Sequence, residues 1–68
     1  MKRWKLIEYR GSKSQAEMAR KYHVSQQAWS AWERGAKTPE LFTMKRLEQD
    51  IGAPMETIFF DVFNNTWA

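Results

Sequence analysis

Two adjacent glutamines, Gln26 and Gln27, carry the side chains of this 68-residue chain that are best suited to reading nucleic-acid bases. A glutamine amide presents a donor and an acceptor side by side, which matches N6 and N7 of adenine in the major groove. One turn further along, the Ser30 hydroxyl can bond to several bases and the Ala31 methyl can meet the methyl of thymine. We therefore predict that base contacts come from Gln26, Gln27, Ser30 and Ala31.

A second set of polar residues lies on either side of these four and is suited to phosphates. Gln15 opens the preceding predicted helix, where its amide can meet a phosphate. Basic and hydroxyl residues follow the helix that carries the paired glutamines. Contacts of this kind position a protein on DNA and read no sequence. The predicted backbone contacts are Gln15, Ser25, Arg34, Lys37 and Thr38.

The charge of the chain is divided unevenly between its two halves. Residues 1–37 hold nine basic and three acidic residues, a net charge of +6, whereas residues 38–68 hold two basic and five acidic residues, a net charge of −3. The two values agree with the net charge of +3 for the whole chain. A basic half beside an acidic half indicates that one end meets a polyanion. The alternative is surface charge scattered without such a partner.

The residue types do not favour catalysis, a metal site or a cofactor. The chain has no cysteine, and His23 is its only histidine, so there is no second ligand or catalytic partner for that ring. We predict no enzyme activity, no cofactor and no small-molecule ligand. The basic start leads into no long apolar run, so neither a signal peptide nor a membrane span is predicted, and the lack of cysteine fits the cytoplasm.

Helices must position the polar residues, because apolar residues recur at helical spacing along most of the chain. Ser14 and Glu17 form a capping box for the second helix, and Ser25 is a good N-cap for the third. Thr38 is predicted to cap the fourth helix, with Pro39 at its first position. We predict an all-α domain over residues 1–60 with helices at about 3–10, 14–22, 26–34 and 39–51 and a short fifth helix from residue 54. An aromatic tail follows over 61–68, either a short strand or a docked segment.

The third helix contains two tryptophans, Trp29 and Trp32, with two possible uses. Exposed rings of this kind can be stacking platforms for single strands. Their spacing of three positions favours packing in a core instead. The residues predicted to face the core from the first three helices are Trp4, Leu6, Ile7, Met18, Ala19, Tyr22, Trp29 and Trp32.

The motifs of the second and third helices together resemble one known family. The pattern consists of Ser14-Gln15 with Met18-Ala19, then Val24-Ser25-Gln26-Gln27, then Trp32-Glu33-Arg34-Gly35, followed by Pro39 and Leu47. In this register the chain resembles the phage-repressor and Cro (XRE-like) helix-turn-helix family. The resemblance implies a compact, five-helix, lambda-repressor-like fold in which the helix at 26–34 enters the major groove. It also implies that Gln15 braces the first glutamine of that helix.

Three positions depart from the family pattern. His23 replaces the usual turn glycine, Lys13 replaces an apolar residue, and the usual arginine partner of the glutamate at position 33 is not in its ordinary place. An ungapped alignment puts Glu8 opposite Glu33, whereas a shorter loop after the first helix would bring Arg10 there. Both alignments remain open from the sequence.

Four aromatic residues crowd the acidic end of the chain: Phe59, Phe60, Phe63 and Trp67. One small core filled by two tryptophans has little room for all four, so we expect an exposed apolar patch that forms a dimer interface. The alternative is that some of these rings fold back within a monomer. In a dimer, two recognition helices would enter successive major grooves about 34 Å apart on a palindromic operator.

Taken together, these features predict a sequence-specific regulator of transcription that binds double-stranded DNA, most simply a dimeric repressor encoded by a phage or a bacterium. The rival hypothesis is an anti-repressor or antitoxin-like module that keeps the fold and binds a larger protein through its aromatic end. The polar outer face with Gln26 and Gln27 favours DNA, because a protein-binding module has no need of it.

Overall fold

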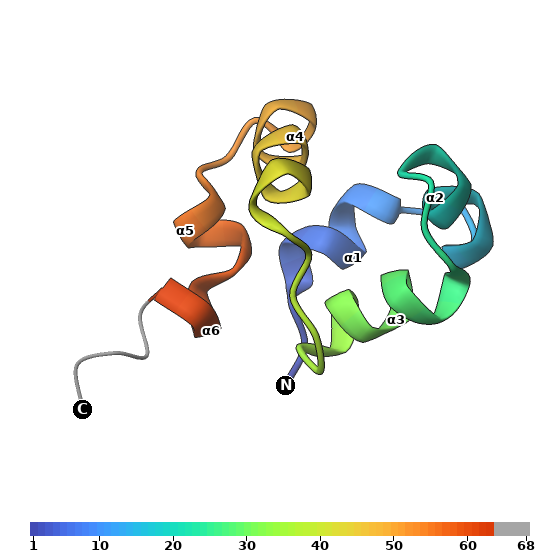
Figure 1. Ribbon diagram of the computed structural model, residues 1–68, viewed down its shortest axis with the longest axis horizontal. Coiled ribbons are helices and arrows are strands. Elements are labelled where there is room, and N and C mark those ends of the chain that lie inside the picture. The colour runs from blue at the N-terminus through green and yellow to red at the C-terminus, as the bar shows by residue number, and fades with distance from the viewer. Residues whose placement is uncertain (64–68) are drawn as a thin grey trace.

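The computed structural model describes residues 1–63, and these residues form six helices and no strand. The helices are α1 (Trp4–Arg10), α2 (Gln15–Lys21), α3 (Gln26–Arg34), α4 (Leu41–Ile51), α5 (Met55–Ile58) and α6 (Phe60–Phe63). Figure 1 shows α2 and α3 together at one end of the molecule and α5 with α6 at the other, with α1 and α4 between them. Over residues 1–63, no helix is both long and apolar enough to span a lipid bilayer.

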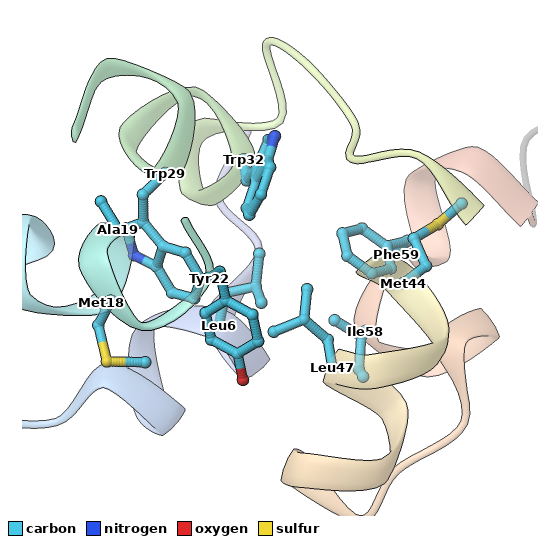
Figure 2. Packing of buried hydrophobic residues seen from close by; sticks show 10 residues of the cluster. All are labelled: Leu6, Met18, Ala19, Tyr22, Trp29, Trp32, Met44, Leu47, Ile58 and Phe59. Atoms are coloured by element: carbon cyan, nitrogen blue, oxygen red, sulfur yellow. The ribbon is translucent and has the colours of Figure 1, made fainter. Parts of the chain in front are cut away.

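The two tryptophans of α3 lie in the core, as their spacing predicts. Trp29 has no exposed surface and stacks on Tyr22 with 5.6 Å between ring centroids. The Trp32 ring is tilted against Trp29 at the same centroid distance. Ala19 is small enough to let α2 and α3 approach closely. The cluster joins five of the helices and comprises Leu6, Met18, Ala19, Tyr22, Trp29, Trp32, Met44, Leu47, Ile58 and Phe59 (Figure 2).

The turn between α2 and α3 is closed by the caps that the sequence predicts. Ser14 accepts a hydrogen bond from the amide of Glu17, whose carboxylate accepts one from the Ser14 amide, so the capping box is complete. His23 adopts a φ of 58° in the turn, and the amide of Val24 then donates to the carbonyl of Ala19 at 2.9 Å. Histidine is one of the non-glycine residues that tolerate this region. Ser25 caps α3 by accepting from the amide of Ala28 at 3.1 Å.

The start of α1 differs from its prediction. Leu6 is buried and Ile7 half-buried, but Trp4 is 59% exposed instead of facing inward. Arg3, which precedes α1, takes the buried place and is only 1% exposed. Successive residues of a helix point about 100° apart, so Trp4 turns outward once Arg3 and Leu6 face the interior.

The start of α4 was also predicted wrongly. The helix begins at Leu41 with Glu40 as N-cap, so Thr38 and Pro39 belong to the preceding loop. The Thr38 hydroxyl accepts a hydrogen bond from the Arg3 guanidinium at 3.0 Å. This bond, together with one from Arg3 to the carbonyl of Lys37, holds the loop away from a helical path.

The segment from residue 59 onward corrects two further predictions. Residues Phe60–Phe63 form a sixth helix, whereas a short strand or a docked segment was predicted from residue 61. The amide of Val62 donates to the carbonyl of Phe59. Phe59 is 0% exposed and packs in the core, so it cannot contribute to a dimer interface. Phe60 is exposed and Phe63 is half-buried against the core. Trp67 lies outside the described residues.

Candidate nucleic-acid interface

The outward face of α3 carries the paired glutamines. Gln26 and Gln27 are both exposed in the first turn of this nine-residue helix, and Ser30 is half-buried one turn later. A hollow of about 250 Å³ lies along this face. Its lining brings together residues predicted to contact bases and residues predicted to contact phosphates, namely Gln15, Gln26, Gln27, Ser30 and Arg34.

A second hollow, of about 330 Å³, lies on the other flank of the same face. Its lining includes Ser25, Gln27, Arg34 and Lys37, so it shares two residues with the first. Ala31 also borders this hollow but is only 7% exposed, and its carbonyl accepts hydrogen bonds from the amides of Ala36 and Lys37 in the chain that follows α3. The predicted contact of its methyl with thymine is therefore withdrawn, and Ala31 acts in packing. Of the four residues predicted to contact bases, Gln26, Gln27 and Ser30 remain on the outward face of α3.

Gln15 is bound differently from the arrangement that the family resemblance implies. Its amide nitrogen donates to an oxygen of Glu33 at 3.0 Å rather than bracing Gln26. An amide nitrogen carries two hydrogens, so one remains for a phosphate oxygen. Thr38 is in a similar position, because its hydroxyl accepts from Arg3 and keeps its own hydrogen to donate.

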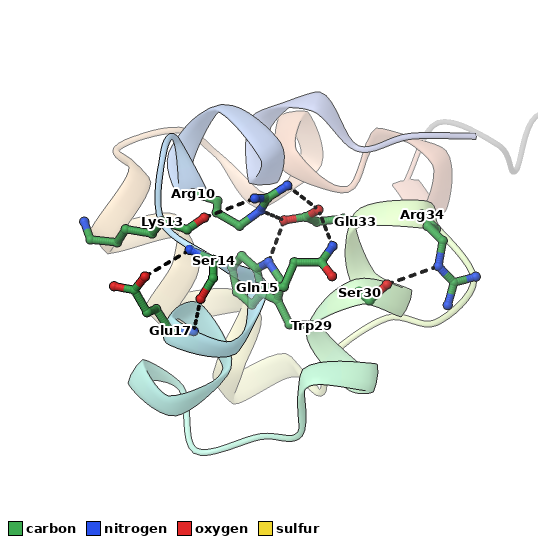
Figure 3. Close-up of polar contacts among 9 residues, drawn as sticks. All are labelled: Arg10, Lys13, Ser14, Gln15, Glu17, Trp29, Ser30, Glu33 and Arg34. Carbon is green, nitrogen blue, oxygen red and sulfur yellow. Dashed lines mark hydrogen bonds and ion pairs between the residues drawn. The ribbon is translucent and has the colours of Figure 1, made fainter.

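Behind this face lies a buried carboxylate, Glu33, which is 4% exposed (Figure 3). It accepts hydrogen bonds from Arg10 Nε at 2.7 Å, from Trp29 Nε1 at 2.6 Å and from the Gln15 amide. We call Glu33, Arg10, Gln15 and Trp29 the Glu33 cluster. It joins α1, α2 and α3, so the outward face of α3 is fixed from behind. Of the two partners that the sequence left open, Arg10 is the one that pairs with Glu33.

The Glu33 carboxyl stays ionised despite its burial. Burial by itself would raise the pKa of this group, but the hydrogen bonds from Arg10, Gln15 and Trp29 outweigh that effect and lower its pKa. A buried charge that accepts several hydrogen bonds and faces an arginine is stable in this form. The cluster therefore supports the outward face of α3 as a fixed scaffold and is not a group poised to exchange protons.

The sequence analysis missed a second buried ion pair, between Arg3 and Asp61. The Arg3 guanidinium donates to both oxygens of Asp61 at 2.9 Å, and to the carbonyls of Trp32 and Lys37 at 3.0 and 2.8 Å. With Thr38, these groups are called the Arg3 cluster. The arginine hydrogen bond and charge lower the pKa of the Asp61 carboxyl, against a smaller opposing effect of burial. The partners are 58 positions apart, so no local spacing signals the pair.

The Arg3 cluster positions the loop that carries Lys37. The guanidinium binds the end of α3 through Trp32, the loop through Lys37 and Thr38, and α6 through Asp61. It also lies over the Phe59 ring, 5.0 Å from the centroid. The exposed Lys37 side chain is thereby held at the margin of the second hollow.

Comparison with known proteins gives one match. A family model described as helix-turn-helix matches residues 6–58, which is more than half of the chain. The matched span contains all of α1 to α5 except the first two residues of α1. Neither the curated proteins nor the solved structures compared with this chain gave a match.

Proposed function

This chain belongs to the helix-turn-helix family of the phage-repressor and Cro (XRE-like) type, whose members are DNA-binding regulators, and we propose that it is a sequence-specific repressor of transcription. It binds a palindromic operator in double-stranded DNA as a dimer, in the cytoplasm of a bacterium. Control comes from its own concentration, from dimerisation or from a protein antagonist.

The observation that carries this proposal is the pair of exposed glutamines in the first turn of α3. Gln26 and Gln27 stand free of the core, while Trp29 and Glu33 anchor the other side of the same helix. In helix-turn-helix proteins the first turn of the recognition helix faces base edges. Each glutamine amide can make a bidentate contact with adenine, worth about 1–3 kcal/mol of discrimination. Ser30 adds a contact one turn further along.

The remaining polar residues of the two hollows hold the phosphates on either side. Arg34 and Lys37 supply positive charge, and Gln15 and Thr38 each keep a hydrogen to donate. Ser25 lies beside them at the N-cap of α3. These contacts fix register and give affinity that falls with salt, whereas discrimination comes from the glutamines.

Dimerisation in this proposal uses the end of the molecule that carries α6. Phe60 and Val62 expose apolar surface there, and Phe63 is half-buried beside them. Leu41 and Phe42, at the start of α4, are more exposed still, Phe42 at 78%. Arg3 binds both Thr38 and Asp61, so the start of α4 and the start of α6 lie near one another. Sedimentation at micromolar concentration should show a dimer, and Phe60→Glu should give a monomer.

The experiment that tests the proposed function is a selection from random duplex DNA at low salt. We expect the wild-type protein to enrich a palindrome whose two half-sites lie about one helical turn apart. Enrichment of a single half-site would contradict the dimer and leave base recognition intact. If no sequence is enriched, the better hypothesis becomes the protein-interaction module that binds a larger protein through its aromatic end.

A further inference from the structure

Trp4 and Lys2 lie beside the proposed recognition face, which is the outward face of α3 with Gln26 and Gln27, although they belong to the N-terminal end of the chain. They line a third hollow, of about 280 Å³, together with Gln15, Ser30 and Arg34. The latter three residues also line the hollow that holds Gln26 and Gln27. The two hollows therefore adjoin each other on one face, and a duplex seated against the glutamines would extend over Trp4.

The exposure of Trp4 contrasts with that of the two tryptophans of α3. Trp29 and Trp32 are buried, whereas more than half of the Trp4 surface faces solvent. The ammonium nitrogen of Lys2 lies 5.3 Å from the centroid of the Trp4 ring. A cation over an indole face is a favourable arrangement that holds both side chains near one another. The pair offers an apolar ring, an indole N–H donor and a positive charge at one place.

The charges around this hollow favour an anionic ligand. Lys2, Arg10 and Arg34 all line it. The one acidic residue there, Glu33, is already paired with Arg10 and is almost fully buried. A phosphate backbone supplies anionic oxygens for the lysine and apolar deoxyribose for the ring.

We propose that Lys2 and Trp4 form a DNA-backbone contact that flanks the bases read by α3. Lys2 binds a phosphate, and Trp4 packs its ring against the adjacent deoxyribose while its N–H donates to a phosphate oxygen. This inference rests on the proposed function, because it needs a duplex on the recognition face. It adds a contact from α1 and its leading residues, outside the helix-turn-helix of α2 and α3.

Quenching of tryptophan fluorescence tests the contact directly. Acrylamide should quench Trp4 in the free protein, and a bound duplex of about 20 base pairs, roughly two helical turns, should protect it. A Trp4→Phe variant identifies the Trp4 signal by subtraction, because it lacks only that indole. A random-sequence duplex at low salt serves as the probe, since a backbone contact does not depend on sequence.

Two variants measure what the contact contributes. Trp4→Ala should bind every duplex about fivefold more weakly, which corresponds to the loss of a partly buried indole. Lys2→Ala should reduce the slope of log affinity against log salt by about 0.9, the value for one phosphate. Lys45→Ala removes another exposed positive charge, from α4, and should leave that slope close to the wild-type value.

The outcomes separate this inference from the proposed function. If the wild type binds duplex DNA and Trp4 stays as quenchable as before, the inference is overturned and the proposed function stands. If the wild type binds no duplex, the proposed function fails and takes the inference with it. A Trp4→Ala variant that changes base preference, or a protein partner that protects Trp4 when DNA does not, would also overturn the backbone contact.

Discussion

The Glu33 cluster and the Arg3 cluster hold the same helix, α3, in opposite ways. In the first, a buried acid receives hydrogen bonds from three side chains of α1, α2 and α3. In the second, a buried base donates to a carboxylate, a hydroxyl and two backbone carbonyls. Both clusters keep a charge in the interior by supplying every partner it needs.

The two clusters differ in what they connect. All members of the Glu33 cluster lie between positions 10 and 33, so it sets the angle of the recognition helix within the helix-turn-helix. The Arg3 cluster reaches from the N-terminus to α6, so it connects the loop that carries Lys37 with the proposed dimer end. The difference indicates that the outward face of α3 is held locally, whereas the loop that carries Lys37 depends on Arg3 and on Asp61 of α6.

The largest expected effect comes from removing the centre of the first cluster. Glu33→Ala leaves the Trp29 N–H buried without its acceptor and Arg10 without its partner. Breaking a buried ion pair in this way costs about 3–5 kcal/mol of unfolding free energy. Denaturant unfolding measures the loss. Glu8→Ala is the matched control, because Glu8 is exposed on α1, and it should stay within about 0.5 kcal/mol of wild type. Equal losses for the two variants would contradict the role given to Glu33.

A smaller effect is expected at the other cluster. Asp61→Asn keeps an oxygen that can accept from Arg3 but removes the charge, and the Asp61 side chain is already partly exposed. We expect a loss of about 1–2 kcal/mol, after allowance for solvent screening. Hydrogen exchange should show faster opening of α6 than in the wild type, with α2 and α3 unchanged. Glu56→Gln, at an exposed position of α5, is the control. Opening of α3 before α6 would contradict the comparison between the clusters.

The pH dependence of stability should contain a small contribution from each cluster. In the folded protein, the pKa of Asp61 is lowered by Arg3. The pKa of Glu33 is raised by burial, but the hydrogen bonds from Arg10, Gln15 and Trp29 outweigh this effect and lower it. Their stabilising contributions are therefore complete above about pH 4–5 and are lost as the pH falls through the lowered pKa values. Thermal unfolding from about pH 7 to about pH 3 should show a flatter curve for Glu33→Gln, and separately for Asp61→Asn, than for wild type. If the pH dependence of a variant matched that of the wild type, ionisation of that carboxyl would not contribute to the stability of the folded protein.

The sequence predicted the parts of the fold that depend on near neighbours. The capping box of Ser14, the cap at Ser25 and the core positions of Trp29 and Trp32 are signalled within a few residues, and the structure confirms them. The helical arrangement around Gln26 and Gln27 followed from the same local patterns. The left-handed conformation of His23 also agrees with its place in the family turn.

The features that were missed depend on contacts between distant positions. Arg3 was counted only toward the surface charge, because no pattern near it in the sequence indicates Asp61 as its partner. Because Arg3 is buried, Trp4 faces solvent. Arg3 also binds Thr38, which lies in the loop before α4, and Asp61, which lies in α6. Phe59 was assigned to an interface because the capacity of the core cannot be judged from composition. The hydrogen bonds of the buried Arg3 to distant residues thus account for several of the predictions that were wrong.

The most direct test of base reading by α3 compares Gln27→Ala with Lys37→Ala on the selected operator and on variants of it. We expect Gln27→Ala to lose roughly 1–3 kcal/mol on the operator and to relax the preference at one base pair. We expect Lys37→Ala to weaken binding to all sequences alike and to reduce the slope of log affinity against log salt concentration by about 0.9. If both variants lost affinity equally on every sequence, α3 would not be reading bases through Gln27.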